Sequence, residues 1–333
     1  MRVRFGYVAM SMVIKNASPS RTMTLTSFNK LADREAAIRK LERIAEENLH
    51  NTLRLLRHNR ANGIEVYRFS SKLIPLATHA DLQDWDPFTA LRAAFAEVGD
   101  YVKAHHMRVS FHPDHFTVLS TPRPEVLASS VRDLQHHGRM LDAMGLGSAA
   151  KNNIHIGGAY GDKRASAARF EEHFAGLERA LQERLTLEND DKTFNAVETL
   201  EVCRHTGLPM VLDLHHQWVN NDGERPWELW PAIQKTWRSP LAQAGSPADQ
   251  PLPPKIHISS PKSERDPRGH ADDVEPGPVL EFLRAVAGST PCLDVMIEAK
   301  RKDEALFNLV RELSRHEGDG VTMAGGAAVD IEP

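Results

Sequence analysis

Residues 108–158 contain, in order, a β-rich segment, RVSFHP (108–113), a helical segment, PEVLASSVRDLQHHGRMLDAMG (124–145), and a second β-rich segment, NIHIGG (153–158). The outer segments are short and rich in Val, Ile and Phe, which is typical of buried strands. The middle segment repeats apolar residues at steps of three and four, which is typical of a helix packed on one face. The stretch therefore predicts a strand-helix-strand unit, whose two strands run parallel because a helix connects them.

The same alternation extends over the whole chain. Eight β-rich segments occupy residues 2–8, 64–70, 108–113, 153–158, 185–189, 210–216, 255–260 and 294–300, with helical stretches such as 31–59 and 87–106 between them. Eight strand-helix units of roughly 40 residues predict a single-domain (β/α)8 barrel, the TIM barrel. The alternative is an open doubly wound sheet, which usually has a glycine-rich turn after its first strand. No such turn follows residue 8 here.

Two segments stand outside this pattern. Residues 238–254 are rich in Pro and Ser and predict a surface insertion, and residues 317–333 predict a flexible C-terminal tail. We therefore expect the barrel domain to span residues 1–316.

Composition excludes several classes of protein. The chain has no run of about 18 apolar residues, and basic residues interrupt the apolar ones at its start, so we expect neither a membrane span nor a signal peptide. Its two cysteines, Cys203 and Cys292, are isolated, which indicates a reducing, cytoplasmic compartment without disulfides. The formal net charge of −4 means that any nucleic-acid contact must come from local patches or from bound metal. We expect a monomer.

Polar residues recur where the predicted strands end. They are His112, His155, Glu188, Asp213, His216, His257 and Glu298, and His79 and His270 lie in the loops after the second and seventh strands. The carboxyl ends of all strands meet at one face of a (β/α)8 barrel, so these nine residues are predicted to converge.

Six His, two Glu and one Asp, without Cys, are typical ligands for zinc or manganese. Nine ligands exceed the needs of one ion, so they indicate two or three ions, an arrangement used to cleave phosphodiesters. His215 is ambiguous, because strict strand alternation places His215, and not His216, on the same face as Asp213. His216 fits only if the strand ends or bulges at Leu214.

Lys255 lies two residues before His257 and therefore on the same face of its strand. A charged ammonium directed into a cationic metal cluster would be strongly repelled. Lys255 must accordingly be neutral, carbamylated or turned away.

Several motifs occur in a fixed order: FGYVAMSM, SFHPDHFTVL, NIHIGG, LEND, DLHH, KIHIS, GHADDV and MIEAK. In this order they resemble the UV damage endonuclease family, a barrel related in architecture to endonuclease IV, over residues 2–302. The resemblance implies a metal-dependent DNA endonuclease that hydrolyses the phosphodiester 5′ to cyclobutane pyrimidine dimers and 6-4 photoproducts in double-stranded DNA and so initiates excision repair. Manganese is the metal that it implies.

The resemblance also implies roles for single residues. The metal ligands are His79, His112, His155, Glu188, Asp213, His216, His257, His270 and Glu298, and Lys255 matches a lysine that is carboxylated in the family. Catalysis would rest on Glu188, Glu298 and Lys255. A Gln-Tyr pair that wedges into the duplex in the family is replaced here by His115-Phe116, and Tyr7 would contact the lesion. Lys262 and Arg268 are expected to hold DNA phosphates.

Two alternatives of other classes are open at this point. A metal-dependent sugar isomerase of the xylose isomerase type also binds divalent ions at the strand ends of a barrel, although its usual two-metal site needs fewer histidines. A catalytically silent barrel that recognises damaged DNA would bind it without cleaving it.

Overall fold

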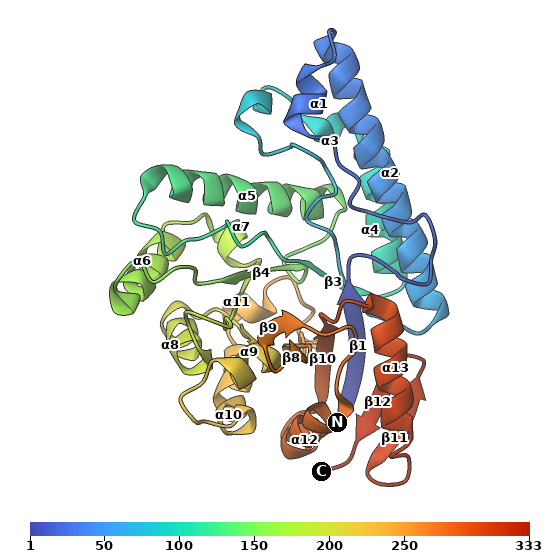
Figure 1. Ribbon diagram of the computed structural model, residues 1–333, viewed down its shortest axis with the longest axis vertical. Helices are drawn as coiled ribbons and strands as arrows, with labels where there is room; N and C mark the ends of the chain where they lie inside the picture. The colour runs from blue at the N-terminus through green and yellow to red at the C-terminus, as the bar shows by residue number, and fades with distance from the viewer.

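The structure, a computed structural model, describes residues 1–333. Its centre is a closed barrel of eight parallel strands in the order β10-β7-β6-β5-β4-β3-β2-β1, with β10 pairing β1 to close the ring (Figure 1). The strands are β1 (Arg2–Val8), β2 (Val66–Arg68), β3 (Arg108–Phe111), β4 (Lys151–His155), β5 (Leu185–Glu188), β6 (Met210–Asp213), β7 (Lys255–Ile258) and β10 (Cys292–Ile297). All eight predicted strands are present, so the predicted (β/α)8 barrel is confirmed.

Helices between the strands cover the outside of the barrel (Figure 1). They are α1 (Leu25–Asn29), α2 (Arg34–Ala61), α3 (Pro87–Ala90), α4 (Arg92–Ala104), α5 (Pro124–Ala143), α6 (Lys163–Ala175), α7 (Arg179–Gln182), α8 (Ala196–Thr206), α9 (Leu214–Val219), α10 (Pro226–Thr236), α11 (Pro240–Gln243), α12 (Pro276–Ala287) and α13 (Lys302–Ser314), with a 3-10 helix, η1, at Ala80–Leu82. The longest, α2, is capped at its N-terminus by Asp33, whose side chain accepts the N–H of Glu35. None of these helices has the length and apolar character required to span a bilayer.

Strand register decides which side chains face the barrel axis. Residues paired across parallel strands point to the same side of the sheet, and His155 pairs with Glu188 while Asp213 pairs with His257. The four side chains therefore lie inside the barrel at its carboxyl-terminal end. The outward residues of the same strands, such as Ile154 and Leu187, pack in the main hydrophobic core beneath the helices.

The opposite end of the barrel interior carries a buried ionic group. Asp294 is fully buried, and its carboxylate accepts from Arg4 Nε at 2.7 Å and from the guanidinium of Arg108. Burial by itself raises the pKa of Asp294, but the two guanidinium groups outweigh it and hold that pKa below its usual value. Lys255 is paired in register with Asp294, so it enters this lower layer rather than the upper one.

The C-terminal residues form a hairpin, so the expectation of a flexible tail at 317–333 is wrong. β12 (Ala328–Ile331) pairs antiparallel with Arg2–Arg4 of β1, and β11 (Val321–Gly325) pairs with β12. The short strand β2 covers only Gly6–Val8 of β1, which leaves the first half of that edge for β12. An exposed strand edge is unfavourable, and the hairpin removes it.

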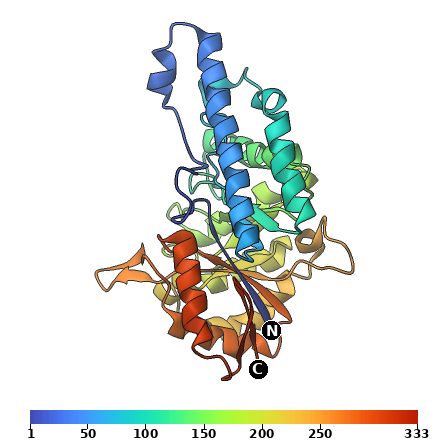
Figure 2. The same ribbon diagram turned by 90° about the vertical axis from the view of Figure 1, so that its right-hand side faces the viewer.

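The predicted insertion at 238–254 is partly packed against the barrel. It begins with α11, which buries Leu241, and Gln243 bonds both the N–H and the carbonyl of Leu252. Figure 2 shows the loop that follows α11 projecting on the side away from the hairpin of β8 (Pro261–Ser263) and β9 (Asp266–His270). This segment also walls a cavity of about 580 Å³ with β3 and α4, at the end of the barrel opposite the predicted metal ligands.

The C-terminal hairpin should be required for stability. Val321, Val329 and Ile331 are almost completely buried, and each buried Val or Ile contributes about 1.5–3 kcal/mol. A chain ending at His316 should therefore lose more than about 4 kcal/mol and melt roughly 8 °C lower or more. Thermal unfolding followed by circular dichroism measures this. A chain lacking only the exposed residues 332–333 is the matched control, and equal melting temperatures for all three chains would contradict the role of the hairpin.

Candidate metal centre

Seven of the nine predicted ligands come together at the carboxyl-terminal mouth of the barrel. They form three groups whose ligand atoms lie within 4.8 Å of one another: His112, His155 and Glu188; Glu188, Asp213 and His216; and Glu188, His257 and Glu298. Glu188 belongs to all three groups. Six strands contribute these residues, because each strand reaches the mouth with an inward-facing position at its end.

Glu188 occupies the middle of the cluster and is almost completely buried. Its Oε2 atom lies 3.3 Å from His112 Nε2 and 3.1 Å from His257 Nδ1, and its Oε1 atom lies 3.6 Å from His216 Nδ1. Each carboxylate oxygen therefore faces different imidazoles. A carboxylate in this position can bridge two cations.

Four imidazoles are oriented by the same kind of hydrogen bond. Their Nδ1 atoms bond backbone carbonyl oxygens: His112 to Pro113 at 2.9 Å, His155 to Glu188 at 3.3 Å, His216 to Asn189 at 2.9 Å and His270 to Glu298 at 3.0 Å. A carbonyl only accepts, so each Nδ1 carries a proton, and Nε2 is the ring nitrogen that remains available to a metal. Fixing the tautomer in this way is how proteins orient histidine ligands toward a metal.

The structure decides between His215 and His216. β6 ends at Asp213, and α9 begins at Leu214, with the Asp213 side chain accepting the N–H of His216 at 2.8 Å. The change from strand to helix returns His216 to the side of Asp213, so the choice of His216 agrees with the geometry. His215 instead forms hydrogen bonds from its two ring nitrogens, through Nδ1 with Ser259 Oγ and through Nε2 to the carbonyl of Pro267, each at 2.7 Å.

Several ligand atoms of the cluster are buried without a hydrogen-bond partner, and this fits a site for divalent cations. Glu188 Oε1, Asp213 Oδ2 and His257 Nδ1 are sealed from solvent and make no hydrogen bond. Nδ1 of His257 lies 3.1 and 3.0 Å from the carboxylates of Glu188 and Glu298 but in poor geometry for a hydrogen bond with either. Buried polar atoms are rarely left without partners, and a cation between these atoms would satisfy all three.

Mutual electrostatics favour charged ligands. Burial lowers the pKa of His257, but the charges of Glu188 and Glu298 outweigh it and raise that pKa to about 9. Burial likewise lowers the pKa of His216, yet Asp213 and Glu188 raise it to about 9. Burial alone would raise the pKa of Glu188, but the facing imidazoles hold it well below its usual value.

Three predicted site residues lie outside the three groups. His270 lies at the rim, with its ring 6.3 Å from that of His216. His79 caps η1, where its Nδ1 accepts the N–H of Asp81 at 3.2 Å, and the structure does not join it to the cluster. Lys255 lies below His257 with its Nζ 3.1 Å from Ser110 Oγ, and burial followed by the field of Arg108 lowers its pKa well below the usual value.

The predicted DNA contacts divide into exposed and buried residues. The side chains of His115 and Phe116 are exposed in the loop after β3, and their rings lie 4.0 Å apart. Lys262 and Arg268 are exposed on the hairpin of β8 (Pro261–Ser263) and β9 (Asp266–His270). Tyr7, in contrast, is fully buried, and its hydroxyl donates to Asn59 Oδ1 at 2.8 Å. The structure therefore places Tyr7 in the core, apart from the exposed residues that are predicted to contact DNA.

A cavity of about 430 Å³ opens beside the cluster. His112, His155 and His216 form one wall, and the loops after β3, β4 and β5 form the others, with His115 at the edge. The cavity thus connects the candidate metal ligands to His115, the neighbour of the exposed Phe116.

Sequence reasoning missed two polar residues of the site. Arg68, at the end of β2, forms an ion pair with Glu298, and Asn153 donates its amide N–H to Glu188 Oε2 while Thr186 Oγ1 donates to Asn153 Oδ1 at 2.7 Å. Both were detectable, because Asn153 precedes His155 by two residues and shares its face, and Arg68 lies near the end of the predicted strand 64–70. Neither side chain is a typical metal ligand, so a pattern of ligands alone does not include them.

The fold and the site define a class: (β/α)8 barrels with a candidate metal centre at the carboxyl-terminal mouth. Endonuclease IV from Thermus thermophilus shares the fold, with a TM-score of 0.55 over 95% of this chain and 99% of that chain at 14% sequence identity.

Within that class the family is shown by sequence. The profile of the family described as UV-endonuclease UvdE matches residues 3–332, and the chain belongs to this family. The UV DNA damage endonuclease of Bacillus pumilus (strain SAFR-032) is 42% identical over 334 residues, which cover 100% of both chains. The crystal structure of SacUVDE matches with a TM-score of 0.79 at 28% identity and covers 95% of this chain and 99% of that chain.

The carboxylate of Glu188 should control how His216 and His257 titrate in the metal-free protein. With pKa values of about 9, His216 and His257 should be cationic at pH 7. Their stabilising contribution should be complete below a pH of about 6.5, the pKa of an unfolded His, and be lost as the pH rises through 9. Glu188→Gln should lower both pKa values, because it removes a charge that both imidazoles face.

Histidine NMR titration in EDTA measures the two values. Glu171→Gln is the matched control, because Glu171 pairs with the exposed His205 at 2.8 Å, outside the site. Unchanged titration of both imidazoles in Glu188→Gln would refute the central place of that carboxylate.

Proposed function

We propose that this protein is a metal-dependent UV damage endonuclease, which hydrolyses the DNA phosphodiester 5′ to cyclobutane pyrimidine dimers and 6-4 photoproducts. The observation that carries the proposal is the set of three ligand groups sharing Glu188 in a chain of the UvdE family. Two or three divalent ions, manganese before zinc, fit a donor set of imidazole and carboxylate. The monomeric state and the cytoplasmic location stay predictions.

Each group of the chain has a task in this reaction. Bound divalent ions would activate a water molecule and neutralise charge on the phosphate. Glu188, which belongs to all three ligand groups, and Glu298, which belongs to one, would hold the ions, and Asn153 fixes the Glu188 carboxylate through its amide. Lys255 is buried beside Ser110 with a strongly lowered pKa. The lowered pKa favours the unprotonated amine, which is the form that carbon dioxide carboxylates, and this supports carboxylation of Lys255.

Recognition of the lesion is assigned to the loops around the mouth. The side chain of Phe116 is 74% exposed and can stack on a base, while His115 beside it offers hydrogen-bonding nitrogens. Damaged base pairs cost less to unstack, so a wedge at this position selects them. The cavity beside the ligands would receive the displaced nucleotides, and Lys262 and Arg268 would hold backbone phosphates.

The alternatives are weaker. A sugar isomerase is not favoured, because the match to the UvdE family extends over residues 3–332. A catalytically silent DNA-binding barrel would have no use for sealed, unpaired ligand atoms, and Glu188, Asp213 and His257 all retain such atoms.

Incision of a defined substrate tests the function. Purified protein with manganese should cut a labelled duplex once, 5′ to a single pyrimidine dimer, and leave the undamaged duplex intact. Glu188→Gln should lower the rate at least about 1000-fold, because each ligand group loses a charged member. Glu171→Gln is the control and should cut like wild type. Intact damaged DNA at full metal loading would reject the proposal.

Metal content tests the ligand set separately from activity. After dialysis against manganese, elemental analysis should find more than one ion per chain in wild type and almost none in Glu188→Gln, since all three groups share this residue. His79→Gln should lose at most one ion, because His79 stands apart from the cluster. Full loading of the Glu188→Gln protein would contradict the three-group site.

A further inference from the structure

Arg68 enters the mouth from β2 with most of its hydrogen-bonding capacity unused. Its side chain is 14% exposed and pairs through Nη1 with Glu298. The guanidinium has five N–H donors, and this pair with Glu298 is its only side-chain interaction with the protein. Its remaining nitrogens are not among the sealed unpaired atoms, so they open toward solvent at the mouth.

Lys302 is a second cation in the same place. It is half-buried at the first residue of α13 and makes neither a side-chain hydrogen bond nor an ion pair. Burial and then the field of Arg68 lower the pKa of Lys302, and Glu298 offsets this only in part. Its backbone also has a φ of 52°, a left-handed conformation that is costly for a lysine.

The acid closest to Lys302 in sequence is already engaged. The carboxylate of Asp303 accepts from Ser11 Oγ, from the N–H of Met12 at 2.8 Å and from His58 Nε2 at 3.1 Å. These bonds tie the loop after β1 to α13. Glu298 is therefore the only carboxylate that offsets the charges of Arg68 and Lys302, and it is also a member of a metal-ligand group.

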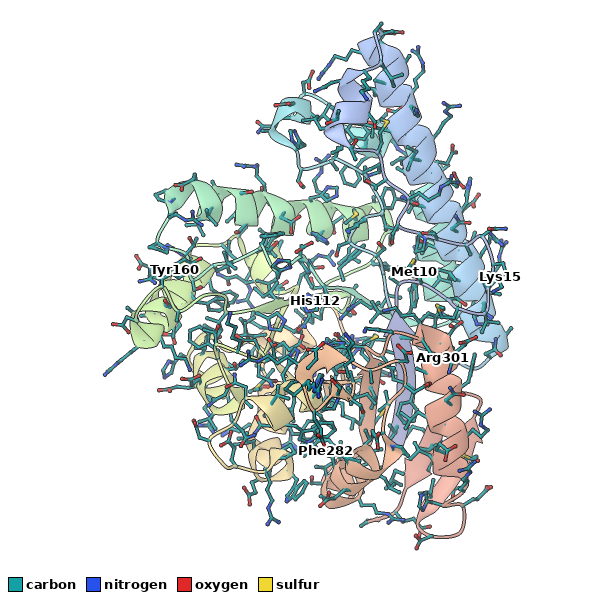
Figure 3. All side chains as sticks on the ribbon, viewed as in Figure 1. Met10, Lys15, His112, Tyr160, Phe282 and Arg301 are labelled. Atoms are coloured by element: carbon teal, nitrogen blue, oxygen red, sulfur yellow. The ribbon has the colours of Figure 1, made fainter.

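This arrangement has an excess of positive charge on one side of the cluster. In Figure 3, Met10 and Arg301 mark this side of the mouth, and Tyr160 lies on the other side of His112. If Glu298 donates its charge to a bound cation, Arg68 and Lys302 are left with even less compensation. Partly buried cations without a counter-charge are unfavourable unless an anion joins them.

We propose that Arg68 and Lys302 form a subsite for a backbone phosphate of the DNA substrate, beside the ligand group of Glu188, His257 and Glu298. The proposal rests on the proposed function and assigns it a phosphate contact on the β1, β2 and β10 side, opposite the cavity beside His155. A guanidinium with free N–H donors and an ammonium with no partner provide both charge and directed hydrogen bonds for a phosphodiester. The pair would thus fix the substrate strand relative to the metal ligands.

Salt-dependent DNA binding in EDTA tests this subsite without metal or turnover. Each neutralised phosphate contributes about 0.9 to the slope of log K against log salt. Lys302→Gln should therefore lower that slope by about 0.9 and weaken binding on the order of fivefold to tenfold at low salt, for damaged and undamaged duplexes alike. Lys302→Arg keeps the charge and should retain the wild-type slope. Lys235→Gln removes an exposed lysine from the last turn of α10, and it should also match wild type.

The outcomes separate the subsite from the proposed function. If a folded Lys302→Gln protein keeps the wild-type slope of log K against log salt, the subsite is overturned. It is also overturned if Lys235→Gln lowers that slope as much as Lys302→Gln does. Inorganic phosphate is the second probe: if Lys302→Gln abolishes its binding but leaves DNA binding unchanged, the pair is a free-phosphate site and the DNA assignment is wrong. Failure of wild type to cut a dimer-containing duplex in manganese would reject the endonuclease, whereas the slopes decide the subsite independently.

Discussion

The buried carboxylate of Glu188 is the constraint on which the site depends. An ionised carboxylate sealed inside a barrel is unfavourable unless cations surround it. Here the imidazoles of His112, His216 and His257 face its two oxygens, and the amide of Asn153 donates to one of them. The remaining ligands follow from this arrangement, because each must present its own donor atom to the same small volume. One residue thereby joins three ligand groups into a single centre.

The barrel interior separates two kinds of charge along its axis. At the mouth, carboxylates and imidazoles leave donor atoms unpaired, which prepares the site for cations. One layer below, Arg4 and Arg108 compensate Asp294, and burial together with the field of Arg108 lowers the pKa of Lys255. A lowered pKa favours the uncharged amine, which does not repel cations above it. The two layers are therefore compatible although they are only two residues apart on β7.

The mouth is asymmetric around this centre. On the side of β3 to β5 lie a cavity and the exposed His115-Phe116 pair, which suit displaced bases. On the side of β1, β2 and β10 lie Arg68 and Lys302, which suit a phosphate. In the proposed function, local cations such as Arg68 and Lys302 would hold the DNA, since the net charge of −4 does not favour binding by the chain as a whole.

The sequence alone determined the eight strands, their parallel order and the clustering of seven candidate ligands, because strand periodicity and the barrel's single carboxyl-terminal face leave little freedom. It did not determine the C-terminal hairpin, whose short strands form only because β2 leaves half of the β1 edge open. Nor did it fix the burial of Tyr7, the separation of His79, or the ion pair between Arg68 and Glu298. Those features depend on contacts between residues far apart in the chain. Local patterns encode which face of a strand is buried, whereas only the closed barrel decides which side chains meet inside it.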